Sequence, residues 1–437
     1  MAGHSTEPSS DSRGLPVQTL AAEVVRGPDA GLRHAAESET LSVGTANGND
    51  LVLTDPTVSR FHVELATSGE GIRVEDHGST NGTLFEGARI HQGVLPAGST
   101  LTLGNTVLRL DGGRRVTVEL HDEDELAGLY GRTPIMRRLM ARIERAAAAD
   151  SAILLVGESG TGKELVARAL HDRGRRRDAP FVTVDCGSLS PGLVASELFG
   201  HEKGAFTGAA TQHTGAFERA NGGTLFLDEV GELPNALQAT LLGALERRRF
   251  RRVGGREEVA VDVRVVGATH RDLRAEVNAG TFRLDLYYRL AVVVLRIPPL
   301  RERREDIPIL VEHFLREAGA LEEISTVVPP DAMEALAAHA WPGNVRELRN
   351  VVEATLVMGE APPLGDAPAG PDGTMDVVEA ALGHGYKEAR SAVLDDFERR
   401  YCDALLNRAG GNVSRAARNA RMDRTYLIKL LAKHGLK

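Results

Sequence analysis

A glycine-rich segment that follows a short apolar run constrains this chain more than any other feature. Residues 152–156 (AILLV) read as a buried strand, and residues 157–164 (GESGTGKE) follow directly. The three glycines of this segment let backbone N–H groups close around phosphate oxygens without a clash from Cβ atoms. Lys163 would pair with the phosphates, and a helix that begins near Glu164 would point its positive end at them. The segment therefore predicts a phosphate-binding loop, with a chance glycine-rich turn as the alternative.

The sequence around this loop predicts an α/β domain over residues 128–360. Thr133 and Pro134 are typical of a helix start. Short apolar runs then alternate with helical patterns, which indicates a parallel sheet covered by helices. After the first run, they lie at 181–184, 224–227 and 263–267. From about residue 305 the pattern is helical only, which predicts a small helical lid.

The remaining parts of the chain have a different texture. Residues 1–18 are rich in Ser, Gly and Pro and are expected to be disordered. Residues 19–115 consist of short alternating runs separated by Asn-Gly, Asp-Pro and Gly-Asn turn signals, which predicts an all-β sandwich. Residues 361–385 are expected to form a linker, and residues 386–437 are expected to be all-α. The chain is therefore predicted to be multidomain.

Charge and cysteine content limit the class of protein. The formal net charge of -9 argues against a uniformly basic nucleic-acid-binding surface, but residues 408–437 carry eight Lys or Arg residues and one Asp. The two cysteines, Cys186 and Cys402, fall in different predicted domains, so a disulfide framework is not expected. No run approaches about eighteen apolar residues, and the start has no apolar signal core. We therefore expect a cytoplasmic protein with no membrane partner.

Two more motifs, taken with the phosphate-binding loop, point to a family. Residues 204–209 read GAFTGA, and residues 222–229 (GGTLFLDE) read as a strand that ends in two carboxylates. In this order the three motifs resemble the central AAA+ domain of bacterial sigma-54-dependent transcriptional activators, over about residues 128–360. Glu164 favours this family, because it typically has glutamate where other phosphate-binding loops have Ser or Thr.

The resemblance implies an ATPase that uses ATP and Mg²⁺. Asp228 would hold Mg²⁺, and Glu229 would polarise the attacking water. His270 would read the γ-phosphate, and Arg346, within WPGNVREL, would contact the bound nucleotide. The residues expected to contact the nucleotide are Gly157, Glu158, Ser159, Gly160, Thr161, Gly162, Lys163, Glu164, His270 and Arg346.

The resemblance also implies a homo-oligomer. Arg283 and Arg289, within FRLDLYYRL, would reach the nucleotide of a neighbouring subunit and stabilise negative charge there. An arginine that acts on another subunit requires an assembled ring, which in this family is hexameric and forms from dimers. A solvated surface arginine is the alternative for each position.

One position departs from the family pattern. The family has Asn after the second strand, where it restrains the catalytic glutamate, and this chain has Asp185. An aspartate that faces Glu229 would repel it unless a proton, a water molecule or a cation lies between them. The hypothesis is that the basal ATPase activity, or its coupling to transcription, differs from that of the family.

The GAFTGA run is the segment that contacts sigma-54 in this family. The expected contact residues are Gly204, Ala205, Phe206, Thr207, Gly208 and Ala209. The glycines would let a loop swing out, with Phe206 and Thr207 exposed at its tip. An exposed aromatic ring is unfavourable unless a partner covers it. A core phenylalanine on a tight turn is the alternative.

Residues 44–103, within the 19–115 domain, resemble a forkhead-associated (FHA) domain through VSRFH at 58–62 and STNG at 79–82. The resemblance implies binding of a phosphothreonine protein, with the phosphopeptide contacted by Ser59, Arg60, Thr80 and Asn81. Thr45 stands where the family has an arginine, so a main phosphate cation is absent. An FHA fold that contacts protein without phosphate is therefore the alternative.

The 386–437 segment resembles a Fis-type helix-turn-helix. Small alanines on the first helix would allow a close crossing with a second helix at about 423–434. The expected DNA-binding residues are Arg424, Thr425, Tyr426 and Lys429. The alternative is a solvated basic helix.

These features together predict a sigma-54-dependent transcriptional regulator. ATP hydrolysis in a ring would remodel the sigma-54 RNA polymerase holoenzyme and open promoter DNA, an FHA domain would control the ring, and the basic segment would bind upstream DNA. Two alternatives stay open at this point. One is a AAA+ remodeller of another protein that uses the basic segment as a tether. The other is a DNA-bound repressor whose ATPase Asp185 has disabled.

Overall fold

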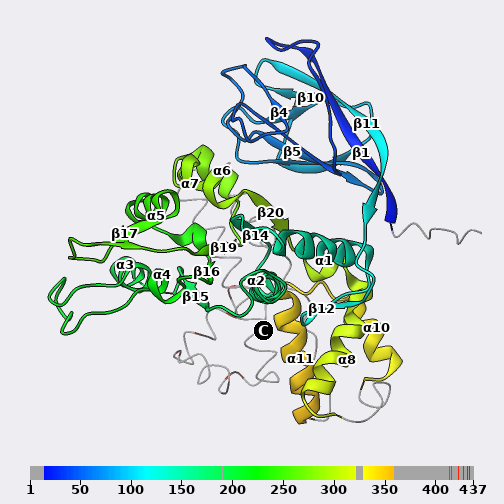
Figure 1. The fold of residues 1–437 in the computed structure, drawn as a ribbon. Coiled ribbons are helices and arrows are strands. Elements are labelled where there is room, and N and C mark those ends of the chain that lie inside the picture. The colour runs from blue at the N-terminus through cyan, green and yellow to red at the C-terminus, as the bar shows by residue number, and fades with distance from the viewer. Residues whose placement is uncertain are drawn as a thin grey trace, which may run out of the picture. The chain divides into compact units, whose positions relative to one another are not determined.

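The computed structural model describes residues 14–188, 190–320 and 328–358, together with Val413, Arg415, Met422, Leu427, Leu431 and Lys433. The chain divides into two compact units, Met1–Pro362 and Pro363–Lys437. The first unit contains an N-terminal β domain, an α/β domain and a helical lid (Figure 1).

The N-terminal domain consists of two sheets that share one core. One sheet has the order β2-β1-β11-β10-β7-β8 and the other β4-β3-β5-β6-β9. Leu20, Leu65 and Leu108 come from both sheets and are buried in the same apolar cluster, as a sandwich requires. The strands are β1 (Gly14–Arg26), β2 (Arg33–Ala35), β3 (Thr40–Gly44), β4 (Leu51–Val52), β5 (Val63–Ser68), β6 (Gly71–Asp76), β7 (Thr83–Phe85), β8 (Ala88–Ile90), β9 (Gln92–Leu95), β10 (Thr100–Leu103) and β11 (Thr106–Glu119).

The structure corrects one expectation for this domain. The composition of residues 14–18 predicts disorder, but these residues form the start of β1. Gly14 to Gln18 pair with Glu119 to Arg115 at the end of β11. The composition of this short segment gives no sign of the ladder, because its partner lies about a hundred residues further along the chain.

The α/β domain is built on a parallel sheet, as the alternation of runs predicts. Its strand order is β15-β16-β19-β14-β20, and all four neighbouring pairs are parallel. Leu225 and Leu227 pack into the apolar cluster on one face, and Phe226 packs into the cluster on the other, so both faces are covered. The strands are β14 (Ile153–Val156), β15 (Phe181–Asp185), β16 (Thr224–Asp228), β19 (Arg264–Thr269) and β20 (Val293–Arg296). The edge strand β20 is not among the strands that the sequence predicts.

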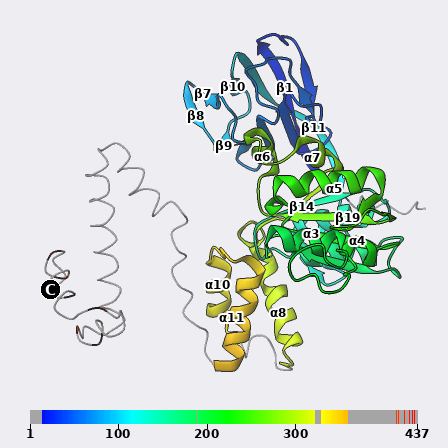
Figure 2. The same ribbon diagram turned by 90° about the vertical axis from the view of Figure 1, so that its left-hand side faces the viewer.

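Helices and two short hairpins surround this sheet, and a separate group of helices forms the lid (Figure 2). Around the sheet lie α1 (Pro134–Ala147), α2 (Lys163–Asp172), α3 (Pro191–Phe199), α4 (Ala216–Arg219), η1 (Val230–Glu232), α5 (Asn235–Arg247), α6 (Leu273–Ala279) and α7 (Leu284–Leu290). The hairpins are β12 (Glu125–Leu126) with β13 (Leu129–Tyr130), and β17 (Arg249–Arg251) with β18 (Glu258–Ala260). The lid contains η2 (Leu300–Glu302), η3 (Arg304–Asp306), α8 (Ile307–Glu317), α10 (Pro330–Ala338) and α11 (Asn344–Met358).

Buried polar contacts join the lid to the α/β domain. Thr133 is the N-cap residue of α1 and Pro134 is its first residue, as predicted. The Thr133 hydroxyl does not cap the helix, however, but donates to Asp306 at the start of the lid, at 2.8 Å. Trp341 is fully buried in the lid, where its Nε1 donates to the carbonyl of Leu336.

In the second unit, Val413, Leu427 and Leu431 are buried. The predicted DNA-binding residues Arg424, Thr425, Tyr426 and Lys429 lie outside the described residues, as does the predicted linker. Within the described part of the chain, no helix has both the length and the apolar character needed to cross a bilayer.

Candidate active site

The glycine-rich loop connects β14 to α2 at the carboxyl end of the parallel sheet. Gly160 and Gly162 adopt φ values of 77° and 102°, which residues with a side chain rarely adopt. A Cβ at Gly160 would also lie 2.3 Å from the carbonyl oxygen of Gly343 in the lid. The loop therefore requires glycine for two reasons: its backbone conformation and its close contact with the lid.

Lys163 lies at the start of α2 and points into this loop. It is largely buried, and its Nζ donates to the carbonyls of Gly157 and Glu158 at 3.0 and 3.3 Å. The same Nζ lies 3.4 Å from Glu229 Oε1. Lysine is a compact point charge, and here it stands between the loop carbonyls and the carboxylate that ends β16.

Asp228 and Glu229 lie where β16 ends, beside the loop. Burial, and then the nearby charge of Glu229, raise the pKa of Asp228, and Lys163 partly opposes this shift. A divalent cation beside Asp228 would stabilise its ionised form, which burial and Glu229 disfavour. Carboxylate oxygens are among the donors that Mg²⁺ prefers. The residues present therefore fit a magnesium-bound phosphate group.

The catalytic glutamate predicted from the sequence contacts the predicted sensor histidine. Glu229 Oε2 lies 2.7 Å from His270 Nδ1 and accepts a bond from the His270 backbone N–H at 3.2 Å. Glu229 has a φ of 49°, in the left-handed region. Such backbone strain in a non-glycine residue persists only where the surrounding structure holds it, and it is common at active sites.

Asp185 does not hold Glu229 in this structure. Its Oδ1 accepts bonds from the backbone N–H groups of Gly187 and Ser188, at 2.9 and 3.2 Å. The carboxylate therefore stabilises the turn that follows β15. Among the described residues no hydrogen bond joins Asp185 to Glu229, and the predicted effect of Asp185 on the ATPase stays a prediction. The charge of Asp185 still acts locally, because after burial it is the next cause that raises the pKa of Cys186, to about 12.

The lid contacts the loop through the predicted Arg346. Its backbone N–H donates to the carbonyl of Gly160 at 3.3 Å, and its Nη1 donates to Ser159 Oγ at 3.1 Å. The guanidinium is therefore beside the residues that are expected to surround the phosphates.

Sequence reasoning missed Asn344, which anchors this lid contact. Asn344 is fully buried with a φ of 53°. Its Nδ2 donates to Glu158 Oε2 and the Ser159 carbonyl at 3.0 and 3.1 Å, and its Oδ1 accepts from the Leu300 backbone N–H at 2.8 Å. Its place two residues before Arg346 in WPGNVREL is the signal that could have identified it.

Two arginines at the start of the lid were also missed. Arg301 forms two hydrogen bonds with the Glu158 carboxylate, at 2.8 and 2.6 Å, and these bonds hold the pKa of Glu158 below its usual value. Arg303 is buried and donates to the Thr161 carbonyl at 3.2 Å. Burial lowers the pKa of Arg303 to about 10.

Arg283 and Arg289 are not brought to this loop. Arg283 is exposed and pairs with Asp285, with nitrogen–oxygen distances of 3.0 and 2.7 Å, and Arg289 donates to the Leu245 carbonyl at 3.1 Å. Among the described residues, no hydrogen bond or ion pair joins either arginine to the loop or to Glu229.

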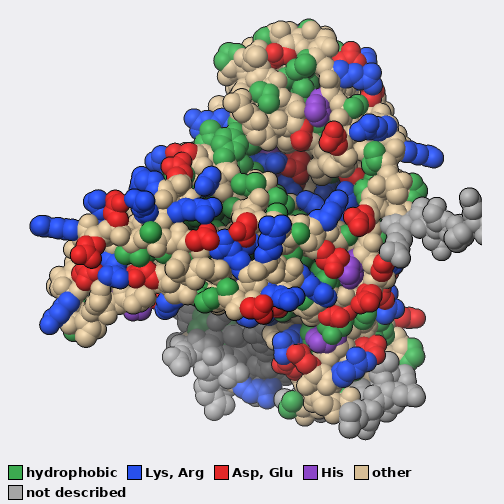
Figure 3. Space-filling model, in the orientation of Figure 1, with side chains coloured by type: hydrophobic (Ala, Val, Ile, Leu, Met, Phe, Trp, Pro, Cys, Tyr) green, Lys and Arg blue, Asp and Glu red, His purple; other side chains and the backbone are tan. Residues whose placement is uncertain are grey.

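The GAFTGA segment belongs to a projecting loop between α3 and α4. Gly204 and Gly208 have φ values of 83° and 106°, and the Gly204 N–H donates to the Ala209 carbonyl at 2.9 Å. Phe206 is 40% exposed, with its ring edge against His201, and Thr207 is exposed. Charged side chains of both signs cover the projecting end of the domain that carries α3, α4 and β17 (Figure 3).

The four predicted phosphopeptide residues come together at one end of the N-terminal domain. The Thr80 backbone N–H donates to Ser59 Oγ at 3.0 Å, and Asn81 Nδ2 donates to the Thr57 carbonyl at 2.8 Å. Arg60 is exposed and lies next to Ser59 in the same loop. His62 is fully buried, and its Nδ1 accepts the Ser59 backbone N–H at 3.1 Å, so this side chain supports the loop rather than facing a ligand.

Comparisons with known proteins cover most of the chain. Residues 129–296 match the Sigma-54 interaction domain, residues 301–365 match the AAA+ ATPase lid domain, and residues 23–112 match a family described as the cytoplasmic domain of an inner membrane component of T3SS. The structure is similar to NtrX from Brucella abortus in complex with ATP, at 39% identity and a TM-score of 0.50, over 70% of this chain and 69% of that one.

Two curated relatives are similar in sequence. The transcriptional regulatory protein ZraR of Klebsiella oxytoca is 45% identical over 321 residues, which is 70% of this chain and 69% of the relative. The DNA-binding transcriptional regulator NtrC of Azospirillum brasilense is 48% identical over 261 residues, which is 60% of this chain and 52% of the relative. Together with the matched AAA+ and lid domains, these identities show that the chain belongs to the family of sigma-54-dependent transcriptional regulators.

Proposed function

We propose that this chain activates sigma-54-dependent transcription by hydrolysing ATP in a homo-oligomeric ring. One observation carries the proposal: Lys163, Asp228, Glu229 and His270 converge where β14, β16 and β19 end, beside the glycine-rich loop. Ligands of open α/β sheets bind at this edge. Mg²⁺ held by Asp228 would neutralise phosphate charge there.

The chemistry follows from what each side chain can do. Lys163 exchanges its bonds to two loop carbonyls for the more strongly charged phosphate oxygens. Glu229 is held by His270, and it must turn from that contact to polarise a water molecule. Arg346 would contact the bound nucleotide from the lid, since its guanidinium already contacts Ser159 of the loop.

The second part of the proposal is a ring. Arg283 lies at the exposed start of α7 and, within its own subunit, pairs only with Asp285, two residues away, among the described residues. A guanidinium in this position is available to a neighbouring nucleotide, where it would stabilise the charge of the transition state. Arg289 has the same role in the proposal, although its contact with Leu245 has to open first.

The third part is the mechanical output. Phe206 and Thr207 are exposed on a loop whose ends are left-handed glycines. We propose that hydrolysis moves this loop against the sigma-54 subunit of RNA polymerase. The N-terminal domain would act as an FHA-type sensor of a phosphothreonine protein, and residues 386–437 would bind upstream DNA as a Fis-type helix-turn-helix dimer.

Asp185 would modify the basal rate. Because the Asp185 carboxylate accepts two backbone N–H groups, Glu229 is restrained by His270 and Lys163 instead. We expect Asp185→Asn to change the basal ATPase rate, since it removes a negative charge near Asp228. Steady-state hydrolysis by the two proteins tests this, and equal basal and stimulated rates would contradict it.

A reconstituted transcription assay tests the whole proposal. Purified protein, sigma-54 RNA polymerase and a sigma-54 promoter on supercoiled DNA are combined with ATP or with a non-hydrolysable analogue. We expect transcripts only with hydrolysable ATP. ATP hydrolysis without any promoter opening would favour a remodeller of another protein, and an absence of hydrolysis would favour the DNA-bound repressor.

A further inference from the structure

The N-terminal domain contacts helix α6 of the ATPase through the loop that contains VSRFH. Phe61 is 1% exposed and packs edge-on against the ring of Tyr287, at 5.0 Å between centroids. Asn278 Nδ2 donates to the carbonyls of Phe61 and His77 at 2.6 and 2.8 Å. Phe61 belongs to the apolar core cluster of the ATPase rather than to that of its own domain.

A buried carboxylate meets two guanidinium groups at the same contact. Glu64 of β5 accepts bonds from Arg274 and from Arg296, the latter at 2.8 Å. Burial alone would raise the pKa of Glu64, but the charges of Arg296 and Arg274 outweigh it and hold the pKa below its ordinary value. A buried carboxylate with two guanidinium partners specifies one arrangement of the two surfaces, because separation leaves charges unpaired.

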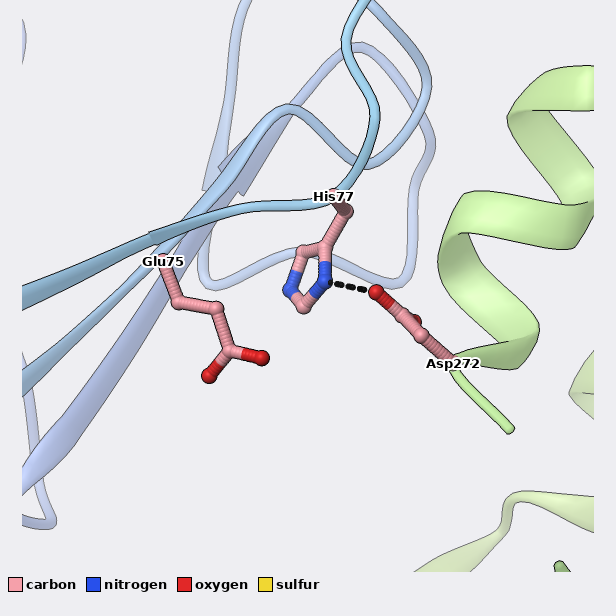
Figure 4. Close-up of side chains that lie close together, drawn as sticks. All are labelled: Glu75, His77 and Asp272. Atoms are coloured by element: carbon pink, nitrogen blue, oxygen red, sulfur yellow. Dashed lines mark hydrogen bonds and ion pairs between the residues drawn. The ribbon is translucent and has the colours of Figure 1, made fainter. Parts of the chain in front are cut away.

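His77 adds a directed contact to the first turn of α6 (Figure 4). Its Nδ1 lies 2.7 Å from Asp272 Oδ2, and Glu75 lies near both. The three side chains have the donor types of a metal site. However, Arg274 Nη1 lies 3.4 Å from His77 Nε2, so a cation would face a guanidinium. The contacts of His77 with Asp272 and Arg274 are therefore hydrogen bonds that join the two domains.

This contact is connected to the catalytic residues through a short segment. Asp272 caps α6, accepting bonds from the N–H groups of Arg274 and Ala275 at 2.9 and 3.2 Å. It lies two residues after His270, which contacts the catalytic glutamate. At its other end, α6 leads within four residues to Arg283. The N-terminal domain thus holds the segment between the sensor histidine and the first proposed trans-acting arginine.

The predicted phosphate-binding arginine takes part in the contact. Arg60 Nη1 donates to the Val277 carbonyl, at the C-terminal end of α6, at 3.3 Å. Ser59, Thr80 and Asn81 border it and are not buried. A neutral carbonyl is a weaker partner for a guanidinium than a phosphate dianion is. A phosphate bound by these residues would therefore draw Arg60 away from α6.

We propose that the N-terminal domain is an intramolecular clamp on α6 that keeps the ATPase in a low-activity arrangement, and that a phosphothreonine peptide bound at Ser59, Arg60, Thr80 and Asn81 releases it. This rests on the proposed ATPase and sensor functions and adds the sign and the site of the control. In the clamped form, α6 cannot shift, so the His270 turn keeps Glu229 Oε2 bonded to His270 and not to the attacking water. Release frees α6 and the segment that leads to Arg283.

A disulfide across the contact provides the main test. A Cβ built on Gly78 lies 3.6 Å from Cβ of Ala275, within the range of about 3.5–4.5 Å that a disulfide requires. The variant Gly78→Cys/Ala275→Cys, in a Cys402→Ser background, is compared oxidised and reduced. Because Gly78 has a φ of 62°, the cysteine is strained there, and the reduced protein and each single variant serve as references.

ATP hydrolysis is measured with a phosphothreonine peptide library and with the same library unphosphorylated. We expect phosphopeptides to stimulate the reduced protein by at least about fivefold, a typical allosteric coupling, and to leave the oxidised protein unchanged. Equal stimulation of both forms would overturn the clamp. If the peptides stimulate neither form, while Asn278→Ala hydrolyses ATP faster than the wild type without peptide, the phosphopeptide is not the ligand that releases the clamp.

Asn278→Ala tests the clamp without any ligand. All three hydrogen bonds that the structure records for the Asn278 side chain reach the N-terminal domain. We expect this variant to hydrolyse ATP at least about fivefold faster than the wild type without peptide. Arg109→Ala, which breaks a surface ion pair with Glu23, is the control and should remain at the wild-type rate. A wild-type rate for Asn278→Ala would overturn the clamp, whereas a lack of hydrolysis in every form would instead overturn the proposed ATPase.

Discussion

The two glycine-rich loops of the α/β domain differ in how the rest of the chain holds them. The loop at 157–162 is contacted from the lid by Asn344, Arg303 and Arg346. In the loop at 204–209, the recorded backbone hydrogen bonds close the loop on itself or join it to its near neighbours Glu202 and Ala210, and Phe206 stays 40% exposed. The first loop is preorganised for a small charged ligand, whereas the second presents an apolar side chain that only a partner would cover.

This difference predicts that hydrolysis and transcriptional output can be separated by mutation. Substitutions beside the loop at 157–162 should remove both hydrolysis and transcriptional output, because output depends on the energy that hydrolysis releases. Substitutions in the second loop should remove output alone.

The largest effect is expected for Glu229→Gln. The amide cannot accept a proton from water, so the ATPase rate should fall by about 10²–10⁴-fold. ATP affinity, measured with a fluorescent analogue, should be retained, since Lys163 keeps its place. Glu246→Gln, an exposed position on α5, is the matched control. A Glu229→Gln protein with near wild-type hydrolysis would remove this carboxylate from the mechanism.

Thr207→Ala is expected to abolish open-complex formation while the ATPase rate stays within about twofold of the wild type, as for other surface substitutions. Potassium permanganate footprinting of the promoter measures opening. Thr211→Ala lies in the same projecting loop, outside GAFTGA, and its exposed side chain makes it the matched control. Normal opening by Thr207→Ala, or an equal defect in both variants, would contradict the role of the loop tip.

Asn344→Ala should weaken the lid's hold on the first loop. It removes three hydrogen bonds, one of them buried, and leaves the Leu300 N–H without a partner, so we expect the free energy of unfolding to fall by about 3 kcal/mol. Urea denaturation measures this, and ATP affinity should fall as well. Asn350→Ala, exposed on the same helix, should change neither. Asn344→Gly separates the hydrogen bonds from the left-handed backbone, because glycine tolerates that backbone.

The smallest effect concerns a region distant from both loops and depends on pH. The pKa of Glu64 is lowered, so its pairing with Arg274 and Arg296 stabilises the protein at pH above its ordinary pKa of 4.5, and this is lost as pH falls through the lowered value. Because Arg296 is partly exposed, we expect Glu64→Gln to reduce the free energy of unfolding by about 2 kcal/mol at pH 7, as for a hydrogen bond to a charged group. The gap should shrink as the pH falls below 4.5. Glu23→Gln is the control, and a gap that does not change with pH would exclude this ionisation.

Much of the catalytic arrangement is predictable because it is encoded locally. Strand, glycine-rich loop and helix follow one another directly in the sequence, and side chains at the ends of neighbouring parallel strands must meet at one edge. The order of these motifs is therefore enough to predict that Lys163, Asp228 and His270 lie together. Locality also explains two errors: β20 carries no motif, and residues 14–18 gain order only from a strand far along the chain.

The amino-acid order by itself determined the backbone requirements of the two loops, since Gly160, Gly162, Gly204 and Gly208 allow conformations that other residues resist. Tertiary structure alone decided which carboxylate meets which partner. Asp185 turns to its own backbone, His270 reaches Glu229, and Glu64 meets an arginine 210 positions away. Pairs so distant leave no periodic or local signature, because only the packing of the folded elements brings them together.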